Sequence, residues 1–203
     1  MKQSIVKKSL DTYEILILKQ IVYLYYPSNL SATKKTDDYI KTQEFINLKA
    51  SINSSSRKEN LEKLENEISV KFNEYKFQKV SLDNWLDRAE CYWLDIIVEN
   101  NLLRYKLQLS KLIPYFTLFL TEVNLDSDNR IFESPPKIIT ENQYSQKSKD
   151  LVTNLSEYIK VNFGLKPFNL SWDNYILEDI SFQDFDFGNF TLYNAFFSNN
   201  LKY

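Results

Sequence analysis

The chain has 203 residues, a formal charge of −2 and 43% apolar residues, which is the composition of an ordinary globular protein. It contains two glycines, one cysteine and no histidine. This composition excludes glycine-rich phosphate loops, disulfide frameworks, histidine-based catalytic triads and histidine-ligated metals. No segment concentrates lysine and arginine as a nucleic-acid-binding face requires, so we expect no nucleic-acid partner.

The first predicted element is a helix over about residues 4–26, which Pro27 ends. Its apolar residues are dense, and we expect most of its circumference to be covered. The most apolar stretch, residues 13–26, contains Glu14 and Lys19, and it is shorter than the roughly 20 apolar residues that a bilayer requires. Because the first residues also lack a signal-peptide pattern, we expect a cytoplasmic protein with no membrane partner.

Three more helices follow in the prediction. A short one over residues 37–50 would turn Ile40, Ile46 and Leu48 inward. Another helix opens with a capping box from Ser56 to Glu59 and runs to about residue 76. It carries one apolar stripe, which consists of Leu61, Leu64, Ile68, Phe72 and Tyr75. The long helix that follows, called the predicted third helix below, begins near residue 81, has about 30 residues and is ended or kinked by a proline at residue 114.

The last predicted helix spans residues 141–163, with Leu151, Leu155, Tyr158 and Ile159 inward. Gly164 follows at the position where a left-handed residue closes a helix. Beyond it, apolar and polar residues alternate on both sides of a Gly-Asn pair at residues 188–189, which predicts a β-hairpin.

These elements predict a mainly α fold, a single-domain helical bundle of about five helices with a small C-terminal β-hairpin. Residues 1–203 would form one helical domain, in which residues 167–203 are an aromatic-rich α/β appendage.

Two groups of carboxylates are candidate interaction sites. Asp83, Asp87 and Glu90 have the spacing i, i+4 and i+7, so on a helix they would form one acidic ridge. Such a ridge is either a solvated face or a docking surface for a basic partner. A metal site in a helical bundle usually adds Glu-x-x-His motifs, which this chain lacks, so we expect no metal or cofactor.

The second group lies near the C-terminus, where Asp184 and Asp186 stand among many aromatic residues that include Tyr193. These aromatics are either the core face of a hairpin or an exposed cluster rimmed by charge, as at interaction hot spots. Cys91, the one thiol, has no histidine to activate it and is interpreted as a partly buried small residue.

The segments at residues 174–179 (NYILED) and 188–197 (GNFTLYNAFF) resemble the ending of some small bacterial immunity proteins. These proteins neutralise polymorphic or contact-delivered toxins, including type VI secretion effectors. The resemblance implies a cytoplasmic, non-enzymatic protein that binds one cognate toxin and blocks its active site or substrate path.

We therefore expect a toxin-neutralising binding protein. The alternative is a structural or adaptor subunit of a bacterial or phage assembly, and a third possibility is an enzyme that uses carboxylates alone. The predicted partner-binding residues are Asp83, Asp87, Glu90, Asp184, Asp186 and Tyr193.

Overall fold

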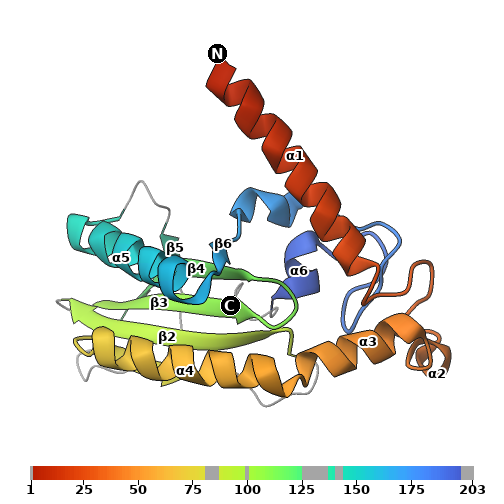
Figure 1. The fold of residues 1–203 in the computed structure, drawn as a ribbon, viewed down its shortest axis with the longest axis horizontal. Helices are drawn as coiled ribbons and strands as arrows, with labels where there is room; N and C mark the ends of the chain where they lie inside the picture. Colours follow the sequence, from red (N-terminus) through yellow and green to blue (C-terminus); the bar gives the residue numbers. More distant parts are fainter. Residues whose placement is uncertain (1, 81–86, 99–100, 125–136, 140–143, 198–203) are drawn as a thin grey trace. The chain divides into compact units, whose positions relative to one another are not determined.

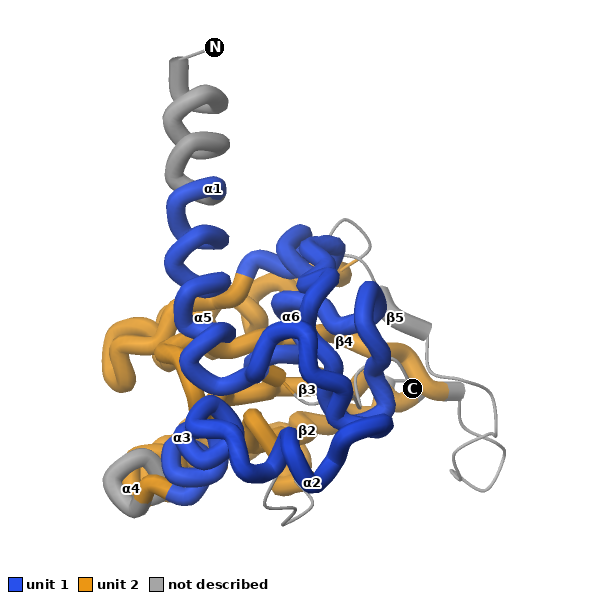
Figure 2. Tube along the Cα trace, turned by 90° about the vertical axis from the view of Figure 1, so that its right-hand side faces the viewer, with its two compact units in different colours: residues 1–53, 169–196 blue, residues 54–168, 197–203 orange. Residues whose placement is uncertain are grey.

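The computed structural model describes residues 2–80, 87–98, 101–124, 137–139 and 144–197. The chain divides into two compact units (Figure 2). Unit 1 combines residues 1–53 with residues 169–196, and unit 2 combines residues 54–168 with residues 197–203. Each unit is therefore built from two segments that are separated in the chain. The prediction of one domain stays a prediction.

Unit 2 is built around a mixed β-sheet, so the predicted helical bundle is wrong. The described part of the chain forms six strands (Figure 1): β1 (Lys76–Lys79), β2 (Ala89–Val98), β3 (Asn101–Ser110), β4 (Tyr115–Asn124), β5 (Lys137–Ile139) and β6 (Lys166–Pro167). Strands β1 to β5 are antiparallel neighbours in chain order, and β6 pairs in parallel with the start of β4. The fold is therefore α/β.

The predicted third helix is replaced by strands. Tyr92 pairs with Leu107 and Leu94 pairs with Tyr105, so these four side chains share one face of the sheet. In β3, leucine and tyrosine at residues 103, 105, 107 and 109 alternate with polar residues. This period of two is the pattern of a strand.

Two helices, α4 (Ser55–Lys71) and α5 (Gln146–Phe163), cover the apolar face of the sheet. The burial predicted for the stripe is confirmed, because Leu64, Ile68, Phe72 and Tyr75 are buried in this core and Leu61 packs against it. The predicted helix end near residue 76 is wrong, since α4 ends at Lys71 and Phe72 and Tyr75 follow it. The capping box is wrong, since the N-cap of α4 is Ser54. Helix α5 buries Leu151, Leu155 and Ile159, whereas Tyr158 is only partly buried.

Unit 1 contains the helices α1 (Lys2–Val22), α2 (Thr36–Tyr39), α3 (Gln43–Ile52) and α6 (Leu192–Phe196) and the 3₁₀ helix η2 (Leu170–Asn174). One apolar core joins the end of α1 to the C-terminal segment. The ring of Tyr26 contacts Phe182 and Phe190 at centroid distances of 5.1 and 5.2 Å. Its hydroxyl donates to the Ala195 carbonyl at 2.7 Å.

Two local expectations for unit 1 are wrong. Leu48 is buried as predicted, but Ile40 and Ile46 are exposed. The predicted C-terminal hairpin is also absent from residues 182–193, where the described backbone forms turns and isolated bridges before α6. The N–H of Asn189 donates to the Asp186 carbonyl, and Gly188 takes the positive φ of +78° inside this turn.

Candidate functional site

Helix α1 carries two apolar stripes on opposite sides. The inner stripe is fully buried, with Leu18 at 1% exposure and Val22 at 0%. The outer stripe consists of Tyr13, Leu16 and Ile17 of α1 together with Leu24 in the turn just after the helix, whose exposures are 66%, 52%, 44% and 56%. The expectation that most of this helix would be covered is therefore wrong.

The outer stripe has the spacing of a helix-packing seam. Tyr13, Ile17 and Gln20 are separated by four and three residues, which places them on one face of α1, and Leu24 follows four residues later in the turn beyond the helix. The sequence continues this spacing at Leu10. An apolar seam of this kind that lies open to solvent is typical of a docking surface for another helix or for an apolar groove.

The same unit contains an acidic segment. Residues 169–196 include five carboxylates and no lysine or arginine. Two of them stabilise the fold: Asp179 accepts a hydrogen bond from the Tyr23 hydroxyl at 2.9 Å, and Asp173 accepts one from the Thr191 hydroxyl at 2.9 Å. The other three, Glu178, Asp184 and Asp186, are exposed.

The predicted residues of the C-terminal segment thus have different surroundings. Asp184 is exposed, and exposed Asp186 accepts a 3.3 Å hydrogen bond from the Thr33 hydroxyl. Tyr193 is only 5% exposed, so its side chain belongs to the core of unit 1. Phe187, by contrast, is 41% exposed. That these residues bind a partner stays a prediction.

The acidic ridge at residues 83–90 does not exist as a helical face. Asp83 lies outside the described residues, Asp87 is half-buried in the segment before β2, and Glu90 belongs to β2. The Glu90 carboxylate forms ion pairs with Lys79 at 3.2 Å and Lys111 at 3.0 Å. Its charge is therefore balanced within unit 2.

The sheet face opposite the α4–α5 core carries charged residues beside aromatic and aliphatic ones. Arg104 donates two hydrogen bonds to Asp95, at 2.9 and 2.8 Å, and its guanidinium stacks 3.5 Å from the centre of the Trp93 ring. Nearby, burial lowers the pKa of Lys106, and the charge of Arg104 lowers it further.

Burial raises the pKa of Cys91 to about 12. The thiol is therefore protonated at neutral pH, which is the opposite of an activated nucleophile.

The described residues contain no group of three or more cysteines and carboxylates arranged to hold a metal ion. Within the same described residues, no helix combines the length and the apolar character that crossing a membrane requires.

No family model, curated protein or solved structure matches this chain. The fold alone assigns the chain to a structural class: it is an α/β protein with a helix-covered mixed sheet in one unit and a helical second unit. The most distinctive surface within that class is the outer stripe of α1, which was not among the predicted partner-binding residues. The 4-3-4 spacing of Tyr13, Ile17, Gln20 and Leu24 was the available sequence signal.

Proposed function

We propose that this protein is a non-enzymatic immunity protein, which binds and neutralises a cognate bacterial toxin in the cytoplasm. The outer stripe of α1 is the observation that carries the proposal. Three large apolar side chains of α1, with Leu24 in the turn just after it, lie open to solvent, and their burial by a partner stabilises a complex by about 25 cal/mol per Å² of apolar area.

The exposed carboxylates of unit 1 suggest the chemistry of the partner. Glu178, Asp184 and Asp186 give the C-terminal segment a negative surface that no lysine or arginine of that segment offsets. Carboxylates at the rim of an interface speed the association of a basic partner, whereas apolar residues at its centre supply most of the affinity. We therefore infer a toxin surface that combines an apolar groove with basic residues.

The resemblance of residues 174–179 and 188–197 to the ending of immunity proteins supports the same function. In this proposal inhibition is steric, because the bound protein blocks the toxin's active site or substrate path. The carboxylates supply attraction and perform no chemical step.

The test uses the product of the neighbouring reading frame, co-expressed with this protein in a bacterial host. We expect that product to stop growth when expressed alone and to be neutralised by the wild-type protein. The double substitution Leu16→Asp with Ile17→Asp should abolish protection and raise the Kd at least about 1000-fold, because an apolar hot-spot residue contributes about 2 kcal/mol or more. The matched control is Val161→Asp, at a residue of α5 in unit 2 that is 77% exposed.

A second pair of variants tests the acidic segment. Asp184→Lys with Asp186→Lys should slow association about tenfold at low salt and leave the melting temperature unchanged. Asp150→Lys with Glu157→Lys, on exposed positions of α5, should not slow association.

Two outcomes would refute the proposed function: a neighbouring product that is harmless, or full protection by the Leu16→Asp, Ile17→Asp variant. A harmless product encoded among virion or secretion-apparatus genes would instead favour the adaptor subunit.

A further inference from the structure

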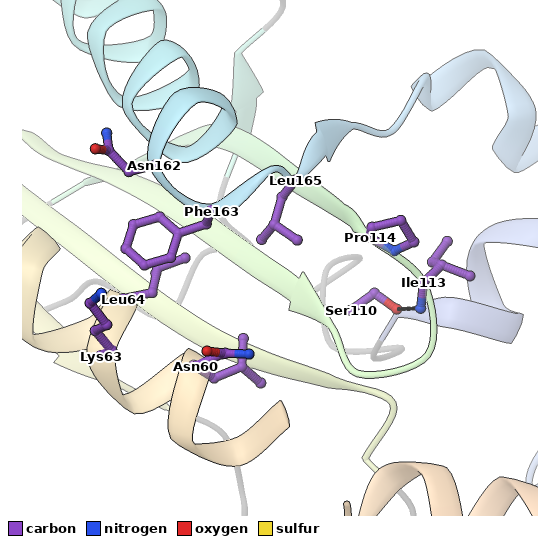
Figure 3. Close-up of a pocket in the computed structure, with 10 residues that line it drawn as sticks. Asn60, Lys63, Leu64, Ser110, Ile113, Pro114, Asn162, Phe163 and Leu165 are labelled. Carbon is purple, nitrogen blue, oxygen red and sulfur yellow. Dashed lines mark hydrogen bonds between the residues drawn. The ribbon is translucent and has the colours of Figure 1, made fainter. Parts of the chain in front are cut away.

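Unit 2 contains a cavity of about 330 Å³ between α4, the β3–β4 connection and the end of α5 (Figure 3). Its volume lies at the lower end of the range typical of small-molecule sites, which is about 300–1,000 Å³. Three apolar pairs, one from each segment, line it: Leu61 and Leu64, Ile113 and Pro114, and Phe163 and Leu165.

A buried hydroxyl distinguishes this cavity from an apolar void. Ser110 is 4% exposed, and its Oγ accepts hydrogen bonds from the backbone N–H groups of Leu112 at 3.2 Å and Ile113 at 3.3 Å. Both lone pairs are thereby used, so only the hydroxyl proton is left to form a bond. No described residue accepts it, and Ser110 lines the cavity. An oxygen atom of a ligand is a suitable acceptor.

The charge of the lining is positive. Among the described residues that line the cavity, Lys63 alone carries a formal charge, and Asn60 and Asn162 supply neutral amides. The Lys63 ammonium lies 3.8 Å from the Glu67 carboxylate, but the Lys63 side chain is 71% exposed. An ion pair this exposed is weak, so the ammonium remains available to an anion.

We propose that this cavity binds a small amphipathic carboxylate. Its apolar body would replace water against the leucine, isoleucine and phenylalanine side chains. Its carboxylate would accept from a donor of the lining and be attracted by the Lys63 charge. This inference concerns unit 2 and does not depend on toxin binding by unit 1.

The experiment titrates the full chain by calorimetry and ligand-observed NMR with octanoate, octanol and octylammonium, which share one apolar chain. We expect saturable one-to-one binding of octanoate with a Kd on the order of 0.1–1 mM, as its small size allows. Octanol and octylammonium should bind at least about tenfold more weakly, because neither carries a negative charge that can pair with the Lys63 ammonium.

Two variants locate the ligand, each with a control. Lys63→Gln should weaken octanoate about tenfold, whereas Lys147→Gln, the same change on exposed α5, should not. Leu165→Trp should fill the cavity and abolish binding, whereas Val161→Trp adds the same ring at an exposed position of α5. Melting curves verify that each variant is folded.

The proposal is overturned by no octanoate binding up to about 5 mM or by equal affinity for octanol and octylammonium. It is also overturned by a folded Leu165→Trp variant that binds octanoate as the wild type does. None of these results would affect the proposed toxin binding, which the α1 variants test separately.

Discussion

At the end of α5, a single glycine has a conformation that other residues adopt at a cost. Gly164 has φ +65° and ψ 16°, and its N–H donates to the Lys160 carbonyl at 3.1 Å. The sequence predicted this left-handed cap correctly, because a glycine followed closely by Pro167 is a local signal that requires no knowledge of tertiary contacts.

Replacing this glycine should measure the backbone cost alone. A Cβ at residue 164 would meet no atom within 4 Å, so steric clash does not contribute. We expect Gly164→Ala to lower the free energy of unfolding by about 1 kcal/mol and Gly164→Asn to lower it less, because asparagine tolerates the left-handed region. Urea denaturation measures both. Equal stability of the alanine variant and the wild type would contradict this account.

The Cys91 thiol should be inert in the folded protein. Burial and, to a smaller extent, the charges of Asp87 and Glu90 raise its pKa to about 12, against the opposing effects of Gln108 and Lys111. We expect iodoacetamide at pH 8 to label the folded chain at least about 100-fold more slowly than the urea-unfolded chain, because the thiolate is the nucleophile. Equal rates would show an accessible, ionised thiol.

The same shift predicts how stability depends on pH. Because the folded pKa lies above the ordinary value of 9.0, the unfolded chain loses the thiol proton first as the pH rises. The contribution of this thiol is complete below about pH 9 and is lost progressively between pH 9 and pH 12. Over that range, the unfolding free energy of Cys91→Ala should fall less steeply than that of the wild type.

At the scale of elements, the helices that cover the sheet were predicted better than the sheet. Helices α4 and α5 each present one apolar stripe, and that pattern is complete within about 18 residues. In β2, by contrast, the apolar residues Tyr92, Trp93 and Leu94 are consecutive. Trp93 lies on the face opposite the α4–α5 core, where it stacks on Arg104. Because apolar residues lie on both faces of the strand, the period of two is hidden, and the same residues also fit the pattern of a helix with a broad apolar face.

Contact between the sheet and α5 can be tested at one hydrogen bond. The Tyr105 hydroxyl of β3 donates to the Ser148 hydroxyl in the first turn of α5 at 3.0 Å, and both residues are buried. We expect Tyr105→Phe and Ser148→Ala each to cost about 1 kcal/mol in unfolding free energy.

The double variant distinguishes a direct bond from two separate defects. If the hydroxyls interact, the double substitution should cost less than the sum of the single ones by about 0.5 kcal/mol or more, measured by denaturant unfolding. Additive costs would mean that the two hydroxyls do not stabilise each other. Tyr13→Phe, at an exposed residue of α1, is the control and should change little.

At the scale of the whole molecule, unit 1 could not be predicted from local patterns, because its two segments are more than a hundred residues apart in the chain. The same limit applies to the candidate site. Which apolar residues of α1 stay exposed depends on how the distant C-terminal segment covers the inner stripe. Sequence alone identified the exposed Asp184 and Asp186, but it grouped them with Tyr193, which is buried.

Two phenylalanines of the C-terminal segment test how its rings hold unit 1 together. Phe190 is fully buried and contacts the rings of Tyr26, Phe182 and Phe185, whereas Phe187 is 41% exposed. We expect Phe190→Ala to lower the free energy of unfolding by about 3–5 kcal/mol, because it leaves a cavity among rings from both chain segments. Phe187→Ala should cost less than about 1 kcal/mol. Urea unfolding followed by near-ultraviolet circular dichroism compares the same truncation at two positions three residues apart. Similar losses for the two variants would mean that the distinction between a buried and an exposed ring is wrong, and that other contacts join the two segments of unit 1.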